Sequence, residues 1–227
     1  MIAVIVPAHN EEEHIGACLA AINLASSSRL LLGEPVVLIV VTDACTDQTG
    51  VIARRLGATV IEVNGRNVGK ARAAGAECAL AAGARWLAFT DADSLVGCDW
   101  LAAQLTLACD AVCGTVAVDD WGDYGERMQH HYQRTYTDAD GHRHIHGANL
   151  GVSAAAYQRV GGFQPLVSSE DVALVEALRS SGASIAWSAA PRVVTSSRKT
   201  FRAPAGFGAT LERIARESDA VVGGPLR

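Results

Sequence analysis

Apolar runs and helical repeats alternate along the first half of the chain. Residues 2–6 and 36–41 are continuous apolar runs, a pattern typical of strands that are buried on both faces. Between them, apolar residues recur over 15–22 at the spacing of one helix face, and Asn10 and Glu13 have the spacing of a pair that caps a helix start. We therefore predict a strand, a helix and a second strand in this order.

The same alternation continues to residue 118. Further strands are predicted at 59–63, 86–90 and 111–118, and further helices at 46–56, 68–82 and 100–109. Strands that alternate with helices favour right-handed crossovers and a mostly parallel sheet. The pattern predicts the α/β class, with a mostly parallel, Rossmann-like central sheet that is flanked by helices.

The pattern changes at residue 119. Residues 119–146 are polar and contain five of the seven histidines, together with one tryptophan and three tyrosines. A lid, an inserted hairpin and a surface for a partner are all compatible with such a stretch. Regular structure resumes near residue 147, with a helix predicted from about 168 to 182 and a short strand at 185–187.

The composition narrows the class of protein. With 227 residues, 49% of them hydrophobic and 19% charged, the chain can bury a large core, which excludes disorder as its main state. A net charge of -5 argues against a protein that holds nucleic acid through bulk charge, so no nucleic-acid partner is expected. No apolar run reaches the roughly 18–20 residues that span a bilayer, whereas a mean hydropathy of +0.18 leaves peripheral membrane contact open.

Two features predict a cytoplasmic protein. The chain passes directly into its first strand and shows no basic leader. Its six cysteines include no C-x-x-C pair, and we expect them to be reduced and to act as small apolar side chains.

Polar side chains follow three of the predicted strands, at the end where open parallel sheets bind their ligands. Asn10 and Glu11 follow the first strand, Asp43 follows the second, and Asp91 and Asp93 follow the fourth. Because Asp91 and Asp93 are two residues apart, a turn can direct both carboxylates at one ligand. Two oxygen ligands of this kind suit Mg²⁺ or Mn²⁺ bound to phosphates. An aspartate-rich turn without a metal is the alternative.

Six segments, taken in order, carry a resemblance to a known family. They are VPAHNEE at 6–12, TDACTDQT at 42–49, NVGKARAAG at 67–75, DAD at 91–93, GAN at 147–149 with GGF at 161–163, and SED at 169–171. In order and approximate spacing, from residue 1 to about 198, the chain resembles the family 2 glycosyltransferases. These share the A-type fold of nucleotide-diphospho-sugar transferases. The family more often has paired aspartates where this chain has Thr42 and Asp43.

The resemblance implies a role for each matching residue. The donor-binding residues would be Pro7, Ala8, Asn10, Glu11, Asp43, Lys70, Asp91 and Ala92. Acceptor binding would involve Gly147, Ala148 and Asn149. Asp93 would bind the metal. Apart from the resemblance, the alternating histidines at 142, 144 and 146 have a spacing that would suit a metal, and His146, directly before Gly147, is a further candidate ligand; a polar surface hairpin is the alternative. Asp171 would be the general base and Glu170 the next candidate, unless Asp171 serves only to cap a helix.

The implied reaction is an inverting transfer from a UDP- or GDP-linked sugar to an acceptor hydroxyl, assisted by Mg²⁺ or Mn²⁺. The Gln-x-x-Arg-Trp motif of polymerising members is absent, which points to transfer of a single sugar. A sugar-1-phosphate nucleotidyltransferase and a non-catalytic nucleotide-sugar-binding protein are the alternatives, and a homodimer stays open. Within one domain of residues 1–227, we expect a nucleotide-binding half at 1–118, a variable insertion or lid at 119–146, an acceptor and catalytic half at 147–202, and a C-terminal tail at 203–227.

Overall fold

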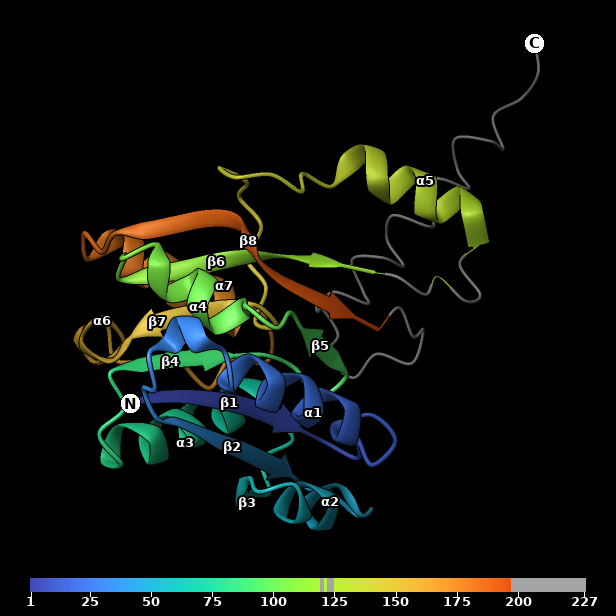
Figure 1. Ribbon diagram of the computed structural model, residues 1–227, viewed down its shortest axis with the longest axis vertical. Coiled ribbons are helices and arrows are strands. Elements are labelled where there is room, and N and C mark those ends of the chain that lie inside the picture. Colours follow the sequence, from blue (N-terminus) through green and yellow to red (C-terminus); the bar gives the residue numbers. More distant parts are fainter. Residues whose placement is uncertain (119–120, 122–124, 197–227) are drawn as a thin grey trace.

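A computed structural model of the chain describes residues 1–118, 121 and 125–196. Its described part forms one sheet in the order β3-β2-β1-β4-β7-β6-β8-β5 (Figure 1). The strands are β1 Ile2–Ala8, β2 Val36–Asp43, β3 Thr59–Val63, β4 Trp86–Phe89, β5 Ser94–Val96, β6 Ala111–Ala117, β7 Leu150–Ser153 and β8 Ile185–Thr195. The α/β class predicted from the sequence is confirmed.

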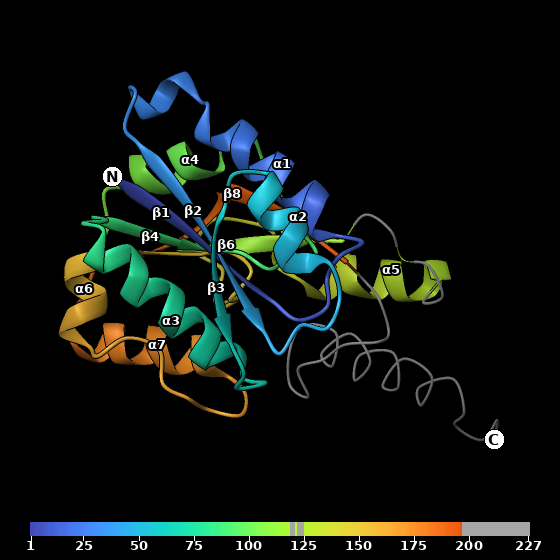
Figure 2. The same ribbon diagram turned by 90° about the horizontal axis from the view of Figure 1, so that it is seen from below.

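Helices cover both faces of this sheet (Figure 2). They are α1 Ile15–Ser26, α2 Thr49–Arg55, α3 Val68–Ala81, α4 Trp100–Thr106, α5 Gly125–Thr135, α6 Ala154–Arg159 and α7 Glu170–Ser180, with a 3-10 turn η1 at Arg29–Leu31. The helices α1 and α4 pack on one face, and α3, α6 and α7 pack on the other. None of the described helices combines the length and apolar character that crossing a bilayer requires.

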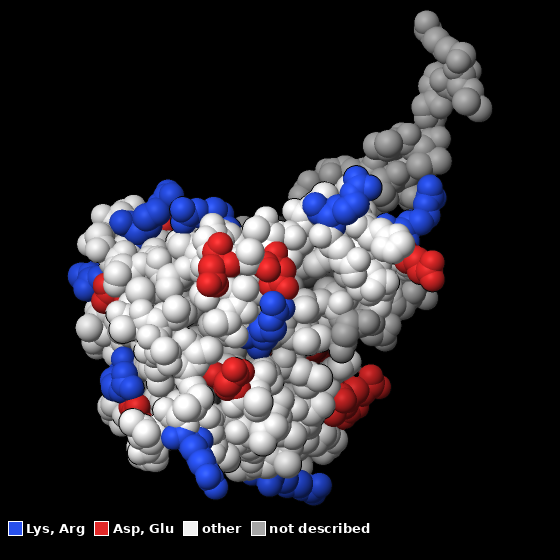
Figure 3. All heavy atoms as spheres, turned by 45° about the horizontal axis from the view of Figure 1, so that its top comes forward, with Lys and Arg blue, Asp and Glu red and all other residues white. Residues whose placement is uncertain are grey.

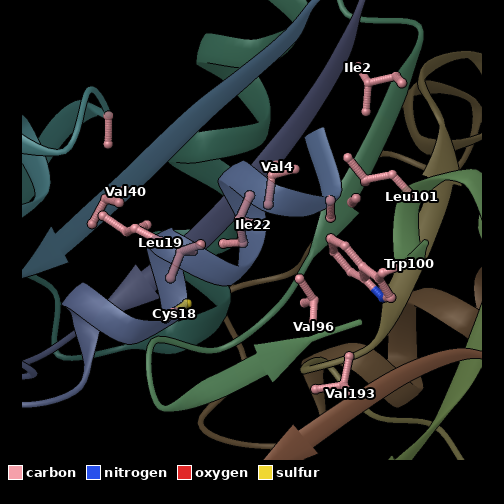
Figure 4. Packing of buried hydrophobic residues seen from close by; sticks show 14 of the residues in the cluster. Ile2, Val4, Cys18, Leu19, Ile22, Val40, Val96, Trp100, Leu101 and Val193 are labelled. Carbon is pink, nitrogen blue, oxygen red and sulfur yellow. The ribbon is translucent and has the colours of Figure 1, made fainter. Parts of the chain in front are cut away.

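The central strand β1 explains why two cores form. Its successive side chains point to opposite faces, so Ile2 and Val4 belong to the cluster beneath α1 and α4 (Figure 4), whereas Ala3 and Ile5 belong to the cluster beneath α3 and α7. Both faces of β1 are therefore buried, as its continuous apolar run predicts. Gly75 allows α3 to lie close to the sheet, because a Cβ there would be 2.5 Å from Cγ2 of Ile5.

The sheet is parallel in its first half and mixed in its second. The strands β3, β2, β1 and β4 are parallel neighbours, whereas β7 runs antiparallel to both β4 and β6, and β5 runs antiparallel to β8. The reversal of β7 has a simple cause. The chain leaves β6 at the edge where the parallel strands end, and no crossover returns it to the opposite edge before β7 begins.

Three sequence predictions need correction. The helix α1 begins at Ile15, and Asn10 does not cap it, because the N-cap residue is His14. In the region 119–146, for which a lid, a hairpin and a partner surface were left open, residues 125–135 form the helix α5 and therefore not a hairpin. The strand expected at 185–187 extends to Thr195. The expected tail at 203–227 lies outside the described residues, and the division into halves stays a prediction.

Charged side chains are dispersed over the surface shown in Figure 3. Groups of Lys and Arg alternate there with groups of Asp and Glu, between wider areas of uncharged residues.

Candidate functional site

The carboxyl ends of β1, β2 and β4 lie together at one edge of the sheet. The strands β1, β2 and β4 are parallel, with β1 between the other two, and the ends of β1 and β2 are in register at Ala8 and Thr42. The loops that follow them therefore border one site, as the sequence predicts for the carboxyl ends of an open sheet. Pro7 and Ala8 are buried within β1, so only their backbone can face a ligand at this edge.

The loops after β1 and β2 are joined by hydrogen bonds, and we call residues 9–14 and 44–49 the paired loops. In each bond a backbone N–H of one loop donates to a side chain of the other. The bonds are Asn10 N to Cys45 Sγ (3.2 Å), Glu11 N to Thr49 Oγ1 (2.8 Å), Glu12 N to Asp47 Oδ2 (3.0 Å), Thr46 N to Asn10 Oδ1 (2.7 Å) and Gln48 N to Glu12 Oε2 (2.9 Å). The side chains of Asn10 and Glu12 thus hold the loops in place, and Glu11 is buried with one carboxylate oxygen 3.3 Å from Nδ1 of His14.

Asp43 has a different environment from the one we expected. Its carboxylate accepts hydrogen bonds from the N–H groups of Gly65 (2.7 Å), Arg66 (2.8 Å) and Asn67 (2.6 Å), and the residue is only 4% exposed. These bonds close the loop between β3 and α3 over the end of β2. The carboxylate therefore organises this loop, and the expected hydrogen bond from Asp43 to a nucleotide base stays a prediction.

Backbone strain concentrates around the same edge. Six non-glycine residues in the described part have positive φ, and four of them border the site: Asn10, Ala44, Arg66 and Ser169. A left-handed backbone at a residue with a Cβ is unfavourable and persists where its surroundings enforce it, which is common at functional sites. Lys70 lies beside this region, exposed in the first turn of α3, with its N–H donated to Oδ1 of the N-cap residue Asn67.

The residues after β4 bring negative charge to the site. Burial raises the pKa of the Cys18 thiol, and the carboxylates of Asp91, Asp93 and Glu11 raise it further. The thiol of Cys18 also donates to the backbone oxygen of Asp91 at 3.4 Å. Three carboxylates from the ends of β1 and β4 therefore act on the same thiol, and Ala92, between the two aspartates in sequence, is buried.

The acidic pair Asp91 and Asp93 suits a metal ion that also binds the phosphates of a substrate. Asp93 is half-buried, and Ser94 Oγ lies 3.5 Å from its Oδ1. Within the described residues, no group of three or more His, Cys, Asp or Glu side chains is arranged to hold a metal. Mg²⁺ commonly binds through one or two carboxylates together with substrate phosphates, so the donor set around Asp93 suits such an ion.

His146 does not join this acidic group through its Nε2 atom. That nitrogen lies 3.0 Å from the hydroxyl of Tyr136, whose ring also stacks on His144. Burial and the neighbouring His144 and His142 lower the pKa of His146 to about 3, so the ring is neutral. The expectation that His146 binds the metal loses support, because its environment is aromatic and the Tyr136 hydroxyl occupies its Nε2.

Asp171 stands in the first turn of α7 and is oriented by backbone groups. Its Oδ2 accepts from the N–H of Gly147 at 2.8 Å, and its Oδ1 accepts from the N–H of Val172 at 2.8 Å. The residue remains partly exposed. The N-cap residue Ser169 has a φ of 60° and makes no side-chain capping bond. Asp171 therefore contributes to the helix start and also ties it to Gly147, while part of its surface stays accessible.

Glu170 is unsuited to the role of alternative base that we considered for it. It is buried and forms an ion pair with Arg72 of α3, whose other terminal nitrogen lies 2.6 Å from Oδ1 of Asp91. Burial raises the pKa of Glu170, and the positive charge of Arg72 opposes that shift. The carboxylate is thus held inside the protein by a cation instead of facing a substrate.

Arg72 was not among the site residues that the sequence predicts, and its pairing with two carboxylates was not anticipated. It is 4% exposed and lies at the centre of the site. Its burial could have been predicted from the neighbouring residues, because Arg72 lies among alanines and between Gly69 and Gly75 on a helix that packs against the sheet. An arginine among such small residues has little solvent to face.

The three residues expected to bind the acceptor separate into two groups. Gly147 lies beside Asp171 and Ala148 is buried next to it. Asn149 is 0% exposed, and its amide donates to the backbone oxygens of Thr115 and Pro191 at 2.7 Å each. The side chain thus joins β6 and β8 inside the core, and the expected contact of Asn149 with an acceptor stays a prediction. Gly114 makes room for it, since a Cβ there would meet the amide at 2.2 Å.

Comparisons with solved structures show that the fold is shared with known proteins. The fold is similar to that of TarS from S. aureus, solved in complex with UDP-GlcNAc, with a TM-score of 0.69 and 16% identity over 100% of this chain and 68% of that chain. Against a longer TarS structure, the chain spans 42% of the length. It is also similar to the mannosyltransferase PcManGT from Pyrobaculum calidifontis, solved with GDP-Man and Mn²⁺, with a TM-score of 0.67 and 21% identity over 99% of this chain and 76% of that one. No curated protein matches the chain.

At these identities, the structural matches establish the fold. The sequence match is more specific, because the model of glycosyl transferase family 2 matches residues 3–161. That region contains both paired loops, the acidic pair after β4 and the Gly147 backbone. The chain therefore belongs to glycosyl transferase family 2, and it is a glycosyltransferase with the A-type fold.

Proposed function

We propose that the protein transfers a single sugar from a nucleotide-diphosphate-sugar donor to an acceptor hydroxyl, with inversion at the anomeric carbon and with Asp171 as general base. The observation that carries this proposal is the geometry of Asp171. Two backbone N–H groups orient its carboxylate, the residue is partly exposed, and the preceding Glu170 is joined to Asp91 through Arg72. A base and a donor-side carboxylate thus border one site.

The donor is proposed to lie at the end of β1, β2 and β4. The paired loops offer a rigid rim there, and Lys70 offers a positive charge near the loop that Asp43 closes. The similar structures named above hold UDP-GlcNAc or GDP-Man, which supports a UDP- or GDP-linked donor for this chain. The sugar itself and the acceptor are left open by these contacts.

Asp93 is the residue proposed to hold Mg²⁺ or Mn²⁺. When bound, such an ion supplies Lewis-acid stabilisation of the negative charge that develops on the departing diphosphate. The similar mannosyltransferase was solved with Mn²⁺, which supports a divalent ion here. Asp91 is paired with Arg72, and Asp93 is half-buried in the turn after β4, at the edge where the donor is proposed to bind.

The proposed role of Asp171 is to accept one proton. As the acceptor oxygen attacks the anomeric carbon, the bond from that carbon to the diphosphate breaks, and the proton of the attacking hydroxyl passes to the carboxylate. Attack from the face opposite the leaving group inverts the centre without a covalent sugar-enzyme intermediate. Membership of the family favours this reaction over nucleotidyl transfer or binding alone.

The direct test measures release of nucleoside diphosphate from UDP- and GDP-linked sugars in the presence of Mn²⁺. Candidate acceptors with free hydroxyls are supplied, and Asp93→Ala is compared with Asp99→Ala, an exposed aspartate that makes no side-chain capping bond. We expect Asp93→Ala to lose Mn²⁺-dependent donor binding while Asp99→Ala retains it. Equal Mn²⁺-dependent binding in both folded variants would remove Asp93 from the proposal, and absence of sugar transfer by the wild-type protein with every donor would remove the function itself.

A further inference from the structure

Arg72 joins the two sides of the site through one guanidinium group. Its Nη2 lies 2.6 Å from Oδ1 of Asp91, which follows β4, and its Nη1 bonds to Oε1 of Glu170, which begins α7. These partners lie 19 and 98 residues away along the chain. A single buried side chain thus connects the donor-side aspartate pair to the residue that precedes the proposed base.

The same guanidinium also lies against the backbone that orients Asp171. A Cβ added to Gly147 would be 2.4 Å from Nη2 of Arg72, so the absence of a side chain at 147 is what allows this approach. The N–H of Gly147 donates to Oδ2 of Asp171. Arg72 therefore constrains the base from two directions, through the Glu170 carboxylate and through the Gly147 backbone.

A purely stabilising role explains this arrangement poorly. Burying charged groups requires desolvation, and a buried ion pair is often no more stable than apolar side chains of similar volume. Arg72 Nε is also buried without a hydrogen-bond partner among the described residues. An ion network retained under these conditions is better explained by the position that it imposes on the groups around it.

We infer that Arg72 is a positioning residue that fixes the start of α7 to the end of β4, so that Asp171 faces the donor at one spacing. This inference rests on the proposed function, in which Asp171 removes the acceptor proton. Arg72 acts through Glu170 and Gly147 and needs no contact with the substrate. Its two terminal nitrogens serve two carboxylates at once, which the single ammonium group of a lysine cannot reproduce in the same geometry.

The central test compares Arg72→Lys with the double variant Arg72→Met/Glu170→Met. For Arg72→Lys we expect kcat to fall by about 10- to 100-fold, the scale of a reacting group displaced by about 1 Å, while KM for the donor changes by less than about twofold. The double variant removes the buried ion pair with little change in volume, so we expect its Tm to stay near that of the wild type. Its kcat should nevertheless stay as low as that of Arg72→Lys.

Arg85→Met is the matched control, because Arg85 forms an ion pair with Glu34 at the surface, away from the site. It should leave kcat unchanged. Hydrogen exchange at the Gly147 N–H is a second measurement that does not depend on enzyme activity. Exchange should be about tenfold faster in Arg72→Lys than in the wild type, because local opening is easier.

The outcomes separate the inference from the proposed function. Wild-type kcat in the double variant, or unchanged exchange at Gly147 in Arg72→Lys, would show that Arg72 is structural only and would overturn the inference. If the wild-type protein transfers no sugar, the proposed function fails, and the exchange measurement still decides whether Arg72 positions the Gly147–Asp171 contact.

Discussion

The paired loops and the start of α7 border the same site, but they are held in different ways. Five backbone-to-side-chain bonds join the paired loops, and most of them lie at the surface or only partly beneath it. The start of α7 depends on one buried guanidinium, one carboxylate and one glycine. The paired loops are thus held by several weak contacts, whereas the start of α7 is held by a few buried ones.

This difference has a physical consequence for mutation. In the paired loops, loss of one bond leaves the others in place, and exposed groups can turn to water, so each loss is small. At α7, removal of one partner leaves a buried charge without compensation, which is far more unfavourable. Single substitutions in the ion network at α7 are therefore expected to lower both stability and kcat, whereas those in the paired loops lower stability mildly and leave kcat almost unchanged.

The largest effect is expected at Asp171. Asp171→Asn keeps the shape of the side chain but removes the proton acceptor, so we expect kcat to fall by about 10²- to 10⁴-fold. Donor affinity should stay near that of the wild type, and Tm should fall only slightly, because the asparagine oxygen can still accept from one of the N–H groups of Gly147 and Val172. Steady-state kinetics and calorimetry measure the two quantities, and normal turnover in Asp171→Asn would reduce the residue to a helix-capping role.

Asp43 gives the next largest effect, on stability rather than on chemistry. Asp43→Ala removes the acceptor of three backbone N–H bonds, and we expect the free energy of unfolding to drop by about 2–3 kcal/mol. Nucleotide binding should weaken as a consequence of the loosened loop at 65–67. Urea unfolding, with Asp99→Ala as the exposed control, tests this expectation. If Asp43→Ala keeps the stability of the wild type and loses only nucleotide affinity, the result would instead support a direct contact between Asp43 and the base.

A smaller loss is expected within the paired loops. Thr49 is buried, accepts from the N–H of Glu11 and donates to Oδ1 of Asp47 at 2.6 Å. Thr49→Val should lower the free energy of unfolding by about 1–2 kcal/mol, while kcat stays within about twofold of the wild type. Thr106→Val, at an exposed site in α4, is the control. A fall in kcat as large as that of Asp171→Asn would break the contrast between the two regions.

The smallest effect has the opposite sign. Ala44 has a φ of 52°, and Ala44→Gly should raise the free energy of unfolding by about 1 kcal/mol, because glycine adopts this conformation without the Cβ penalty. Ala108→Gly, with a φ of 49° away from the site, should give a similar gain. Only Ala44→Gly is expected to weaken nucleotide binding slightly, which calorimetry would detect, since it loosens a loop at the site. Equal affinities in both variants would mean that strain at residue 44 is unrelated to binding.

Much of the structure of residues 1–118 could be predicted from the order of residues alone. Continuous apolar runs specify strands buried on both faces, and helical repeats between them specify crossovers, so the place where Asp91 and Asp93 meet the end of β1 follows from local pattern. The region after residue 118 lacked such a pattern, and α5, the reversal of β7 and the environment of His146 were accordingly missed or left open.

The sequence by itself determined the α/β class, the sheet edge that carries the polar residues, and the family segments that mark Asp93 and Asp171. Only the tertiary structure decided that Arg72 pairs with Glu170, that Asn149 lies in the core, and that Asp43 holds a loop. The physical reason is that burial and ion pairing are set by partners distant along the chain. A residue's type shows what it can bond to, whereas packing determines which of those partners, or water, it meets.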